Sequence, residues 1–398
     1  MLKYSDIKKQ LKINALKEPD DAAAYFTHYL YNQNSELSNY FKKQAKRYWQ
    51  EKSQDKFPDN IKFKQNIPFP EPENPKFTFI DLFAGIGGFR IAMQNLGGKC
   101  VFSSEIDKYA KKTYELNFGE VPFGDLTKIK ENNVPEHDIL CAGFPCQAFS
   151  IAGKRKGFKD ETRGTLFFEL ARIIESKKPK AFFLENVKGL RNHDKGRTLK
   201  TILKVLREDL NYYVPEPQIM NAKDFGVPQN RERIFIVGFR KDIGINNFEY
   251  PEPTKKKVIF ADIKEEEIVS VKYYLSNRYK NTLIKHKLRH KNKGNGFGYE
   301  IINDNQCSNA IVVGGMGRER NIVIDCRLTD FNPITKISGE VNKEGWRRMT
   351  PREWARLQGF PDNFIIDVSD AQAYKQFGNS VAIPAIKATA EMVIKKLI

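Results

Sequence analysis

One cysteine stands where a reactive nucleophile would be expected. Cys146 follows the apolar run 138–143 in the sequence Gly-Phe-Pro-Cys-Gln, and the basic stretch 153–157 comes shortly after it. Cysteine attacks as its thiolate, so a reactive cysteine belongs at a partly exposed strand end near positive charge. Cys141, by contrast, is expected inside a strand. A single loop cysteine is usually inert, so this interpretation depends on the side chains that accompany it.

Three further side chains could assist a covalent reaction at Cys146. Glu185, in the sequence Leu-Glu-Asn-Val, could give a proton or a hydrogen bond to a ring nitrogen. Arg231 and Arg233 are two positions apart in a predicted strand, so both should project to one face and could hold an anion or Glu185. Ordinary alternatives remain, because Glu185 could cap a helix and the arginines could form a solvated strand end.

A glycine-rich turn indicates a second chemical site. The first predicted strand runs into the sequence Phe-Ala-Gly-Ile-Gly-Gly at 83–88, and a predicted helix follows. Glycines let the backbone turn tightly and approach a nucleotide-like ligand at a helix N-terminus. Glu105, about 20 residues on, could accept both ribose hydroxyls. Asp125 could accept from an adenine amino group, although a purely structural turn is the alternative.

The pattern from Phe77 onwards predicts an α/β domain. Runs of β-branched and aromatic residues alternate with amphipathic stretches, as in strand–helix–strand units on a parallel sheet. We expect strands at 77–83, 100–106, 138–143, 181–187 and 233–239, and helices at 89–97 and 164–176.

The regions on either side of this pattern differ in composition. Residues 1–75 combine helical spacing, as at Phe41 and Trp49, with a Pro-rich strip at 68–75, so we expect a separable extension that ends in a linker. Its basic run 41–49 could touch phosphates, although such runs are more often solvated helix faces. The expected units are the extension at 1–75, a catalytic cofactor-binding domain at 76–245, a smaller, mostly β or irregular domain at 246–370 and a returning C-terminal helix at 371–398.

Charge and cysteine content limit the possible classes of protein. Lys and Arg number 67 against 49 acidic residues, a formal charge of +18, which favours a polyanionic partner, although a Lys-rich composition bias would give the same charge. The five cysteines lack the paired spacing of a zinc site or a disulfide framework, so we expect no metal and a reducing cytoplasm. We find no signal peptide or membrane span.

Six sequence blocks occur in an order shared with one enzyme family. FAGIGG, GFPCQ, LENV, QNRERIFIVGF, RRMTPREWARLQGFP and QFGNSVAIPA cover most of residues 77–390. In this order they resemble the bacterial cytosine-5 DNA methyltransferases of restriction-modification systems. The resemblance implies a Rossmann-like domain that binds S-adenosyl-L-methionine, a target-recognition domain after the QNRER block, and a closing helix beside the first strand. The extension before residue 76 departs from the family pattern, and its role is left open.

The resemblance implies a role for each candidate residue. Cys146 would add to carbon 6 of the target cytosine and make carbon 5 nucleophilic, while Glu185 would bind or protonate ring N3. Arg231 and Arg233 would fix the base oxygen, a phosphate or Glu185. Besides Glu105 and Asp125, the cofactor would contact Phe83, Gly85, Ile86, Gly87, Ile106, Leu126, Pro145, Asn379 and Val381. Asn379 could instead cap an ordinary helix.

A stacked base cannot reach such a site, so the target cytosine would be flipped out of the duplex. The Gly- and Lys-rich segment 150–164 could close over double-stranded DNA as a lid, or could be a plain surface loop. Within 245–345, glycine-flanked basic loops could enter a groove, with Arg318 and Arg320 reading guanine and Lys285, Lys287, Arg289, Lys291 and Lys293 on phosphates. A basic solvent-facing hairpin is the alternative. The expected DNA-binding residues are Gln147, Ser150, Lys154, Arg155, Arg289, Arg318 and Arg320.

Target and assembly are further expectations. The recognition segment resembles that of members that read CCGG and methylate the inner cytosine, which implies protection against a cognate restriction endonuclease. An RNA cytosine-5 methyltransferase is one rival, disfavoured by the long basic recognition region. A DNA-binding protein without turnover is another, disfavoured because Cys146 and Glu185 are present. We expect a monomer, since one flipped base needs one active site and no heptad repeat is evident.

Overall fold

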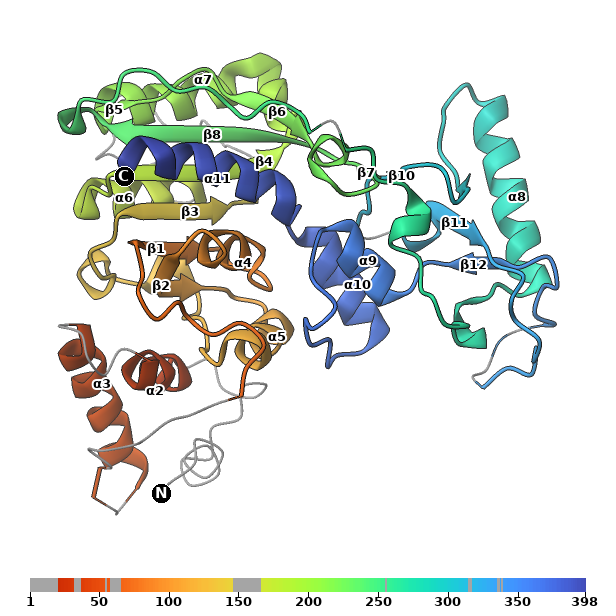
Figure 1. Cartoon of the computed structure of the whole chain (residues 1–398), viewed down its shortest axis with the longest axis horizontal. Helices are drawn as coiled ribbons and strands as arrows, with labels where there is room; N and C mark the ends of the chain where they lie inside the picture. The colour runs from red at the N-terminus through yellow and green to blue at the C-terminus, as the bar shows by residue number, and fades with distance from the viewer. Residues whose placement is uncertain are drawn as a thin grey trace.

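A seven-stranded sheet forms the centre of the larger domain (Figure 1). The computed structural model describes residues 21–31, 37–53, 56–57, 66–145, 166–254, 256–313, 317–334, 337 and 339–398. The strand order is β2-β1-β3-β4-β8-β5, and β6 pairs with β8. The strands of this sheet are β1 (Phe77–Leu82), β2 (Gly98–Ser104), β3 (Ile139–Gly143), β4 (Ala181–Val187), β5 (Tyr212–Tyr213), β6 (Gln218–Asn221) and β8 (Glu232–Arg240).

The five predicted strands are all present, but the prediction of a parallel sheet is wrong for the last one. Strands β1 to β4 are parallel, whereas β8 runs antiparallel to β4, with Ala181 opposite Phe239 and Val187 opposite Arg233. Buried strands carry the same apolar run in either direction, so the sequence pattern does not report how a strand is oriented. The reversal places Arg233 at the same sheet edge as Glu185.

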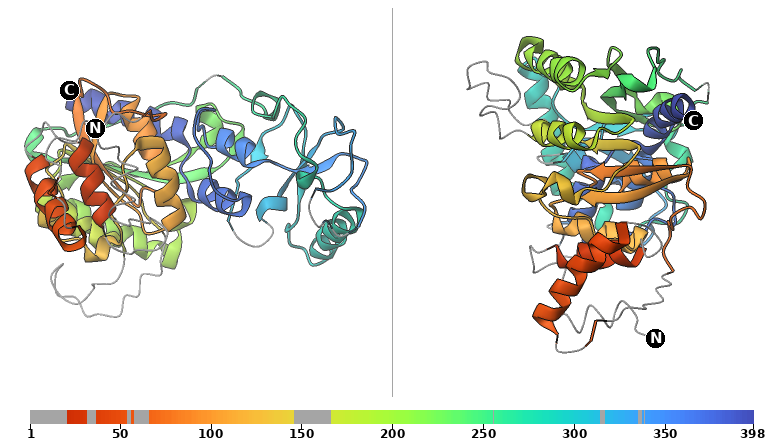
Figure 2. Two further views of the ribbon diagram at one scale, coloured as in Figure 1. Left: turned by 90° about the horizontal axis from the view of Figure 1, so that it is seen from below. Right: turned by 90° about the vertical axis from the view of Figure 1, so that its left-hand side faces the viewer.

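Helices cover both faces of the sheet, as the end-on view in Figure 2 shows. Alternate side chains of each strand enter two separate cores, so that Phe183 lies in one and Leu184 in the other. Helices α4 and α11 contribute to the first core, and α6 and α7 contribute to the second. The helices around the sheet are α4 (Gly88–Gln94), α5 (Lys108–Phe118), α6 (Leu166–Lys177), α7 (Arg197–Lys204) and α11 (Ile383–Leu397). As the resemblance implied, the closing helix α11 packs on α4, which follows β1.

The described part of the N-terminal extension shares a core with the larger domain, whereas we had expected a separable unit. Helices α2 (Ala22–Tyr31) and α3 (Leu37–Lys52) share one apolar core with β1 and β2, through Phe26, Phe41 and Trp49. The Pro-rich strip also packs on the body, where the Phe69 ring lies 5.7 Å from that of Phe118. The helical spacing was read correctly, but nothing in it indicated which surface those apolar side chains would cover.

The smaller domain contains a three-stranded sheet and one long helix. The order is β12-β11-β9, with β9 (Glu300–Ile302), β11 (Asn321–Ile324) and β12 (Trp346–Arg348). Helix α8 (Asn277–Asn292) covers residues 285–292, which we had expected to be loop. It begins at Ser276, whose hydroxyl accepts from the Tyr279 amide. A short parallel pair, β7 (Gln229–Asn230) with β10 (Ser308–Asn309), connects this domain to the end of β8.

Two helices fill the space between the domains. Helices α9 (Pro351–Leu357) and α10 (Asp370–Asn379) bring Trp354 and Phe377 into the same core as Phe89 of α4. The carboxyl ends of the parallel strands face these helices in Figure 1. Across the described ranges, no helix has the length and apolar character needed to cross a membrane.

Candidate active site

The predicted site residues gather beyond the carboxyl ends of β1 to β4. Strand β1 lies between β2 and β3, so the chain leaves β1 towards one neighbour and later returns to its other side. Ligands of open α/β sheets bind outside the strand ends at such a reversal of strand order. These strand ends point toward the region between the two domains (Figure 1).

The turn after β1 has the conformation that its glycines allow. Phe83, Gly85 and Gly87 have φ values of 55°, 56° and 86°, in the left-handed region. A Cβ at Gly87 would lie 2.2 Å from the Phe118 ring, and one at Gly88 would lie 2.7 Å from Val381 Cγ2, so both glycines are required by packing. A Cβ at Gly85 would meet nothing within 4 Å. The turn is therefore packed on its inner side and open at Gly85.

Glu105, just past the end of β2, is bonded to this turn. Its Oε2 accepts from the Gly85 amide at 2.8 Å and its Oε1 accepts from the Asp107 amide at 2.7 Å. Burial raises the pKa of Glu105, and the backbone amides oppose that rise. Each carboxylate oxygen has a second lone pair, so the group can also accept from a ligand. Beside it, Ile106 is 73% exposed and offers an apolar surface at the same edge.

Asp125 lies in the loop that follows α5. Its Oδ1 accepts from the amide and hydroxyl of Thr127, at 3.0 and 2.8 Å, and so caps a short 3-10 turn that begins at Leu126. Both bonds use the same oxygen, which leaves Oδ2 for another donor. Leu126 itself is buried and anchors the turn.

Glu185 and Arg233 form a close pair at the end of β4. Arg233 Nε lies 3.0 Å from Glu185 Oε1, and Glu185 is 7% exposed. Burial raises the pKa of Glu185, although the Arg233 and Arg231 guanidinium groups oppose the rise. A Cβ at Gly143 would lie 3.5 Å from Glu185 Oε2, so this glycine leaves the carboxyl accessible from the β3 side. Burial therefore favours the protonated form of this carboxyl, which can donate to an acceptor.

Asn186 holds the end of β3. Its Nδ2 donates to the Phe144 carbonyl at 2.9 Å, and its Oδ1 accepts from the Val187 amide. The chain therefore leaves β3 in a fixed direction, with Phe144 buried and Pro145 exposed. Cys146, Gln147, Ser150, Lys154 and Arg155, and the predicted lid at 150–164, lie outside the residues that the structure describes.

The prediction that Arg231 contacts the base, a phosphate or Glu185 is not supported by its contacts. Its side chain is 2% exposed, and its guanidinium donates to three carbonyls, those of Ile311 (2.9 Å), Gly378 (3.1 Å) and Ser380 (2.7 Å). Burial lowers the pKa of Arg231 to about 9, and the nearby Arg233 charge adds to this effect. Arg231 therefore positions the segment around residue 379 by bonding its main chain.

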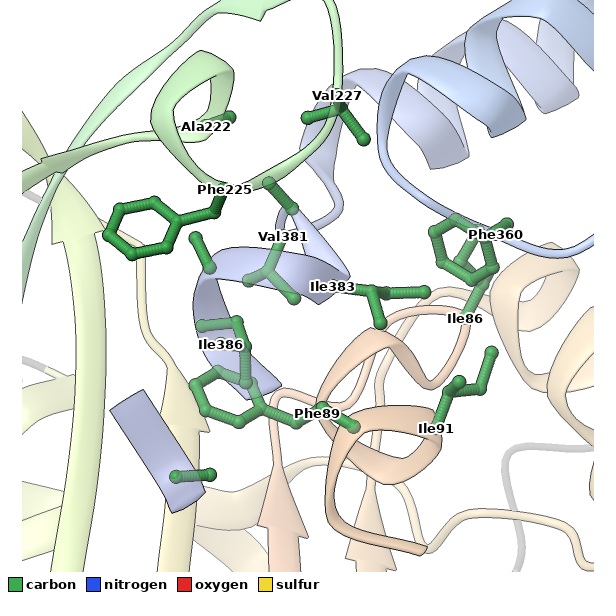
Figure 3. Close-up of a cluster of buried hydrophobic side chains, with 14 of the residues drawn as sticks. Ile86, Phe89, Ile91, Ala222, Phe225, Val227, Phe360, Val381, Ile383 and Ile386 are labelled. Carbon is green, nitrogen blue, oxygen red and sulfur yellow. The ribbon is translucent and has the colours of Figure 1, made fainter. Parts of the chain in front are cut away.

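Asn379 and Val381 lie where that segment meets the turn after β1. Val381 is 8% exposed and packs against Gly88 and Gly143, so it borders both the glycine turn and Glu185. Figure 3 shows it among Phe225, Ile383, Ile386 and Phe89, at the start of α11. Asn379, at the last residue of α10, is exposed. Its side chain is thus free to meet a ligand.

An ion pair that the sequence did not reveal joins the two sides of the cofactor region. Lys375 Nζ on α10 lies 2.5 Å from Asp107 Oδ2, at the N-terminus of α5. Burial raises the pKa of Asp107, but the Lys375 ammonium and the Ala110 amide outweigh it and hold the pKa below its usual value. Asp107 comes two residues after Glu105, and Lys375 comes four before Asn379. The pair therefore connects the end of β2 to the Asn379 segment.

Two glutamines inside the quoted blocks were also missed. Gln229 donates from Nε2 to the Leu357 carbonyl at 2.8 Å and accepts from the Ile311 amide at 3.0 Å. Gln358 donates to the carbonyls of Phe377 and Ser380. Both are fully buried. Their position within the blocks was a signal, but only the fold shows that they tie the smaller domain to the active-site edge.

The basic residues predicted to meet DNA are exposed on the smaller domain. Arg289 lies near the end of α8, and Arg318 and Arg320 lie around a short turn before β11. The Arg318 guanidinium is 5.8 Å from the centre of the Tyr374 ring, so it lies beside α10. Lys287 is paired with Glu300 at 3.0 Å. The glycine-rich stretch 314–316 lies outside the described residues.

The described part of the site fits a nucleoside and contains no cluster for a metal. An open glycine turn, a carboxylate at a strand end and an exposed isoleucine beside it are what a ribose and a base require. Within the residues that the structure describes, no group of three or more His, Cys, Asp or Glu side chains could hold a metal ion.

Comparison with known proteins shows the family. A model of the C-5 cytosine-specific DNA methylases matches residues 77–395. The type II methyltransferase M.HpaII of Haemophilus parainfluenzae is 72% identical over 335 residues, which cover 82% of this chain and 93% of that protein. The type II methyltransferase M.HhaI of Haemophilus parahaemolyticus is 42% identical over 314 residues, covering 78% of this chain and 91% of that protein.

Solved structures agree on the fold. The Dnmt2 methyltransferase of S. pombe superposes with a TM-score of 0.61 over 81% of this chain and 99% of that one, at 17% identity. The Entamoeba histolytica methyltransferase EhMeth gives a TM-score of 0.58 over 81% of this chain and 98% of that one, at 21% identity. At such identities the likeness concerns the fold alone.

Proposed function

The chain belongs to the C-5 cytosine-specific DNA methylase family, and within that family we propose that it methylates the inner cytosine of CCGG in duplex DNA. It is a DNA (cytosine-5)-methyltransferase of the type II restriction-modification class, with S-adenosyl-L-methionine as methyl donor. The target sequence, the roles of individual residues, a monomeric state and pairing with a restriction endonuclease are the parts that we propose.

The Glu185–Arg233 pair is the observation that carries the catalytic assignment. When bound, S-adenosyl-L-methionine supplies an electrophilic methyl group. The Cys146 thiolate adds to carbon 6 of the flipped cytosine, and Glu185 donates to ring N3 as negative charge develops there. Arg233 keeps Glu185 in place. Burial raises the pKa of Glu185, which favours the protonated form that this step needs. Carbon 5 would next take the methyl group, with S-adenosyl-L-homocysteine as the leaving group, and loss of the carbon 5 proton to a base would then expel the Cys146 thiolate.

The other cysteines of the strand region are unsuited to this role. Cys141 lies inside β3 with no exposed surface, and burial raises the pKa of its thiol well above the usual value. Cys100 lies buried in β2, and its pKa is likewise raised by burial. A nucleophilic thiolate needs the opposite environment. Cys146 comes after a strand end that Asn186 fixes, and this supports its assignment as nucleophile.

For the cofactor, we propose that the residues of the glycine turn, Glu105 and Asp125 bind the nucleoside. Glu105 accepts from the ribose hydroxyls, Ile106 packs on the adenine ring and Asp125 accepts from the adenine amino group. The remaining contacts are those of Phe83, Gly85, Ile86, Gly87, Leu126, Pro145, Asn379 and Val381. For DNA, Arg318 and Arg320 read base edges, whereas Arg289 binds phosphate and Gln147, Ser150, Lys154 and Arg155 contact the strand at the flipped base.

Transfer of labelled methyl to short duplexes tests this proposal. We expect label in a duplex with one CCGG, no label when the inner cytosine is replaced by 5-methylcytosine, and a covalent complex when it is 5-fluorocytosine. Cys146→Ser should give neither transfer nor complex. Transfer that survives this substitution would show that Cys146 is not the nucleophile, and equal transfer to a scrambled duplex would show that CCGG is not the target.

A further inference from the structure

The segment that presents Asp125 is held by the N-terminal extension. Asp21 Oδ1, at the start of α2, accepts from the Gly124 amide at 2.8 Å. Six residues further along, Thr27 Oγ1 accepts from the Val121 amide at 3.0 Å. Both amides belong to 121–124, directly before Asp125. Helix α2 therefore fixes the main chain of this segment at two points.

Aromatic packing on Phe123 adds a third point of attachment. The Phe123 ring lies 5.0 Å from the Tyr25 ring and 4.7 Å from the His28 ring, both on α2. The Phe123 main chain also pairs with the end of β2, because its carbonyl accepts from the Glu105 amide at 2.8 Å. The residue covered by α2 thus bonds directly to one cofactor residue and lies two positions from another.

A buried charge network completes the contact. Glu120 Oε1 lies 3.0 Å from His28 Nε2 and 3.3 Å from Arg90 Nη1, and all three side chains have no exposed surface. Burial raises the pKa of Glu120, but Arg90 and His28 outweigh it and lower the pKa to about 2. Arg90 belongs to α4, the helix that follows the glycine turn. The extension therefore supplies, in His28, one partner of the buried Glu120 carboxylate, whose other partner belongs to the helix after the glycine turn.

We propose that α2 is a positioning element of the cofactor site, which acts through Asp21 and Thr27 on the segment 121–124 and so sets the position of Asp125. This inference rests on the proposed role of Asp125 in accepting from the adenine amino group. It gives a function to residues that precede the family match at 77. It also distinguishes α2 from a surface that binds DNA, since its contacts here are with the protein core.

Removing the Asp21 acceptor should weaken binding of the cofactor without slowing methyl transfer at saturating donor. A hydrogen bond of this kind changes an equilibrium by about fivefold, the equivalent of ~1 kcal/mol. We expect Asp21→Ala to raise the dissociation constant of S-adenosyl-L-homocysteine by about fivefold, with kcat at saturating donor unchanged and its KM raised. Asp21→Asn keeps an acceptor oxygen and should restore binding. Glu51→Gln, in an exposed pair with Arg47 on α3, is the matched control.

A ligand without the 6-amino group makes the test specific. The full-length protein and its variants are titrated with S-adenosyl-L-homocysteine and with the analogue whose base is purine. If α2 acts through Asp125, Asp21→Ala and Asp125→Ala should both reduce the preference for the amino ligand, because each effect passes through the same contact. Thr27→Val should do the same, and melting curves identify any variant that is partly unfolded.

The outcomes separate this inference from the assignment on which it rests. Equal loss of both ligands in Asp21→Ala, or no loss at all, overturns the role of α2. A preference that is lost in Asp125→Ala but kept in Asp21→Ala and Thr27→Val also overturns it, while leaving Asp125 as the adenine contact. If the wild type has no preference, the Asp125 assignment is wrong and the inference fails with it.

Discussion

Two regions of the molecule are organised in opposite ways. The first is the catalytic edge, the candidate site around Glu105 and Glu185, and the second is the recognition surface, the exposed Arg289, Arg318 and Arg320 that we propose to meet DNA. At the catalytic edge, Glu105 and Glu185 are held by hydrogen bonds or ion pairs within the protein and are largely buried. On the recognition surface, Arg289 and Arg320 are exposed. The described carboxylates of the first region already have partners within the protein, whereas the arginines that we propose to meet DNA lie at the surface.

The difference follows from the two kinds of ligand. A methyl transfer gains from groups fixed in advance, because no reorganisation is then needed as charge develops. Phosphate binding gains from release of counterions, which needs exposed cations rather than rigid ones. The five predictions below probe the comparison, from the largest expected effect to the smallest.

Glu185→Gln should cause the largest loss of activity. The amide can still donate a hydrogen bond but cannot transfer a proton, so the single-turnover rate should fall about 10²- to 10⁴-fold. DNA affinity at fixed salt should change little. Glu232→Gln is the control, because Glu232 directly precedes Arg233 in the sequence but forms an exposed ion pair with Lys188. A rate within a factor of about two of wild type would show that the carboxyl is not the donor.

The pH dependence of methyl transfer should also reveal the titration of Glu185. Burial raises the pKa of Glu185, so the competent protonated form is present below that pKa and is lost as pH rises through it. The Cys146 thiolate has the opposite dependence. Single-turnover rates of wild type should therefore fall at high pH, and Glu185→Gln should lack this fall. A descending limb that persists in the variant would assign it to another group.

Arg347→Met should reduce stability more than activity per folded molecule. Arg347 has no exposed surface and lies between two carboxylates, at 3.0 Å from Asp325 and 2.7 Å from Glu353. Leaving these charges buried without their partner should lower the free energy of unfolding by about 3–5 kcal/mol. Glu300→Gln, which breaks an exposed pair with Lys287 in the same domain, should cost less than about 1 kcal/mol. Urea unfolding measures the free energy of unfolding of both variants. Equal losses would show that the buried Arg347 pairs stabilise the smaller domain no more than an exposed pair does.

Lys375→Gln should have a moderate effect on the cofactor. Its ion pair with Asp107 joins two sides of the cofactor region, so its loss should speed release of S-adenosyl-L-homocysteine by about two- to fivefold. Lys112→Gln breaks a similar pair with Asp367 further along α5 and should leave release unchanged. Stopped-flow dissociation measures both rates. If the two variants behave alike, the Asp107 pair has no special role.

Arg289→Gln should have the smallest effect and should alter only the salt dependence of DNA binding. Loss of one phosphate contact should reduce the slope of log affinity against log salt by about 0.9, with no change of target sequence. Arg47→Gln on α3, far from the recognition domain in Figure 1, should leave the slope unchanged. A changed slope for Arg47→Gln would extend the DNA-binding surface to the extension.

Local patterns were sufficient for much of the fold and for the choice of candidate site residues. The strands at 77–83 and 181–187 were predicted to within one residue, because alternation and β-branched content are local properties. Glu185 and Glu105 were identified because they lie near the carboxyl ends of such strands. The role of Arg231 was not, since its three carbonyl partners come from positions as distant as Ile311 and Ser380.

By itself, the sequence determined which residues could do chemistry and in what order they follow the strands, because residue type and strand pattern are read within a few neighbours. Only the tertiary structure decided that β8 reverses, that Lys375 reaches Asp107 and that α2 covers Phe123. These are contacts between distant segments, and an apolar or charged side chain carries no mark of the partner it will meet. Long-range packing therefore determines where these groups lie, whereas their chemical character follows from residue type alone.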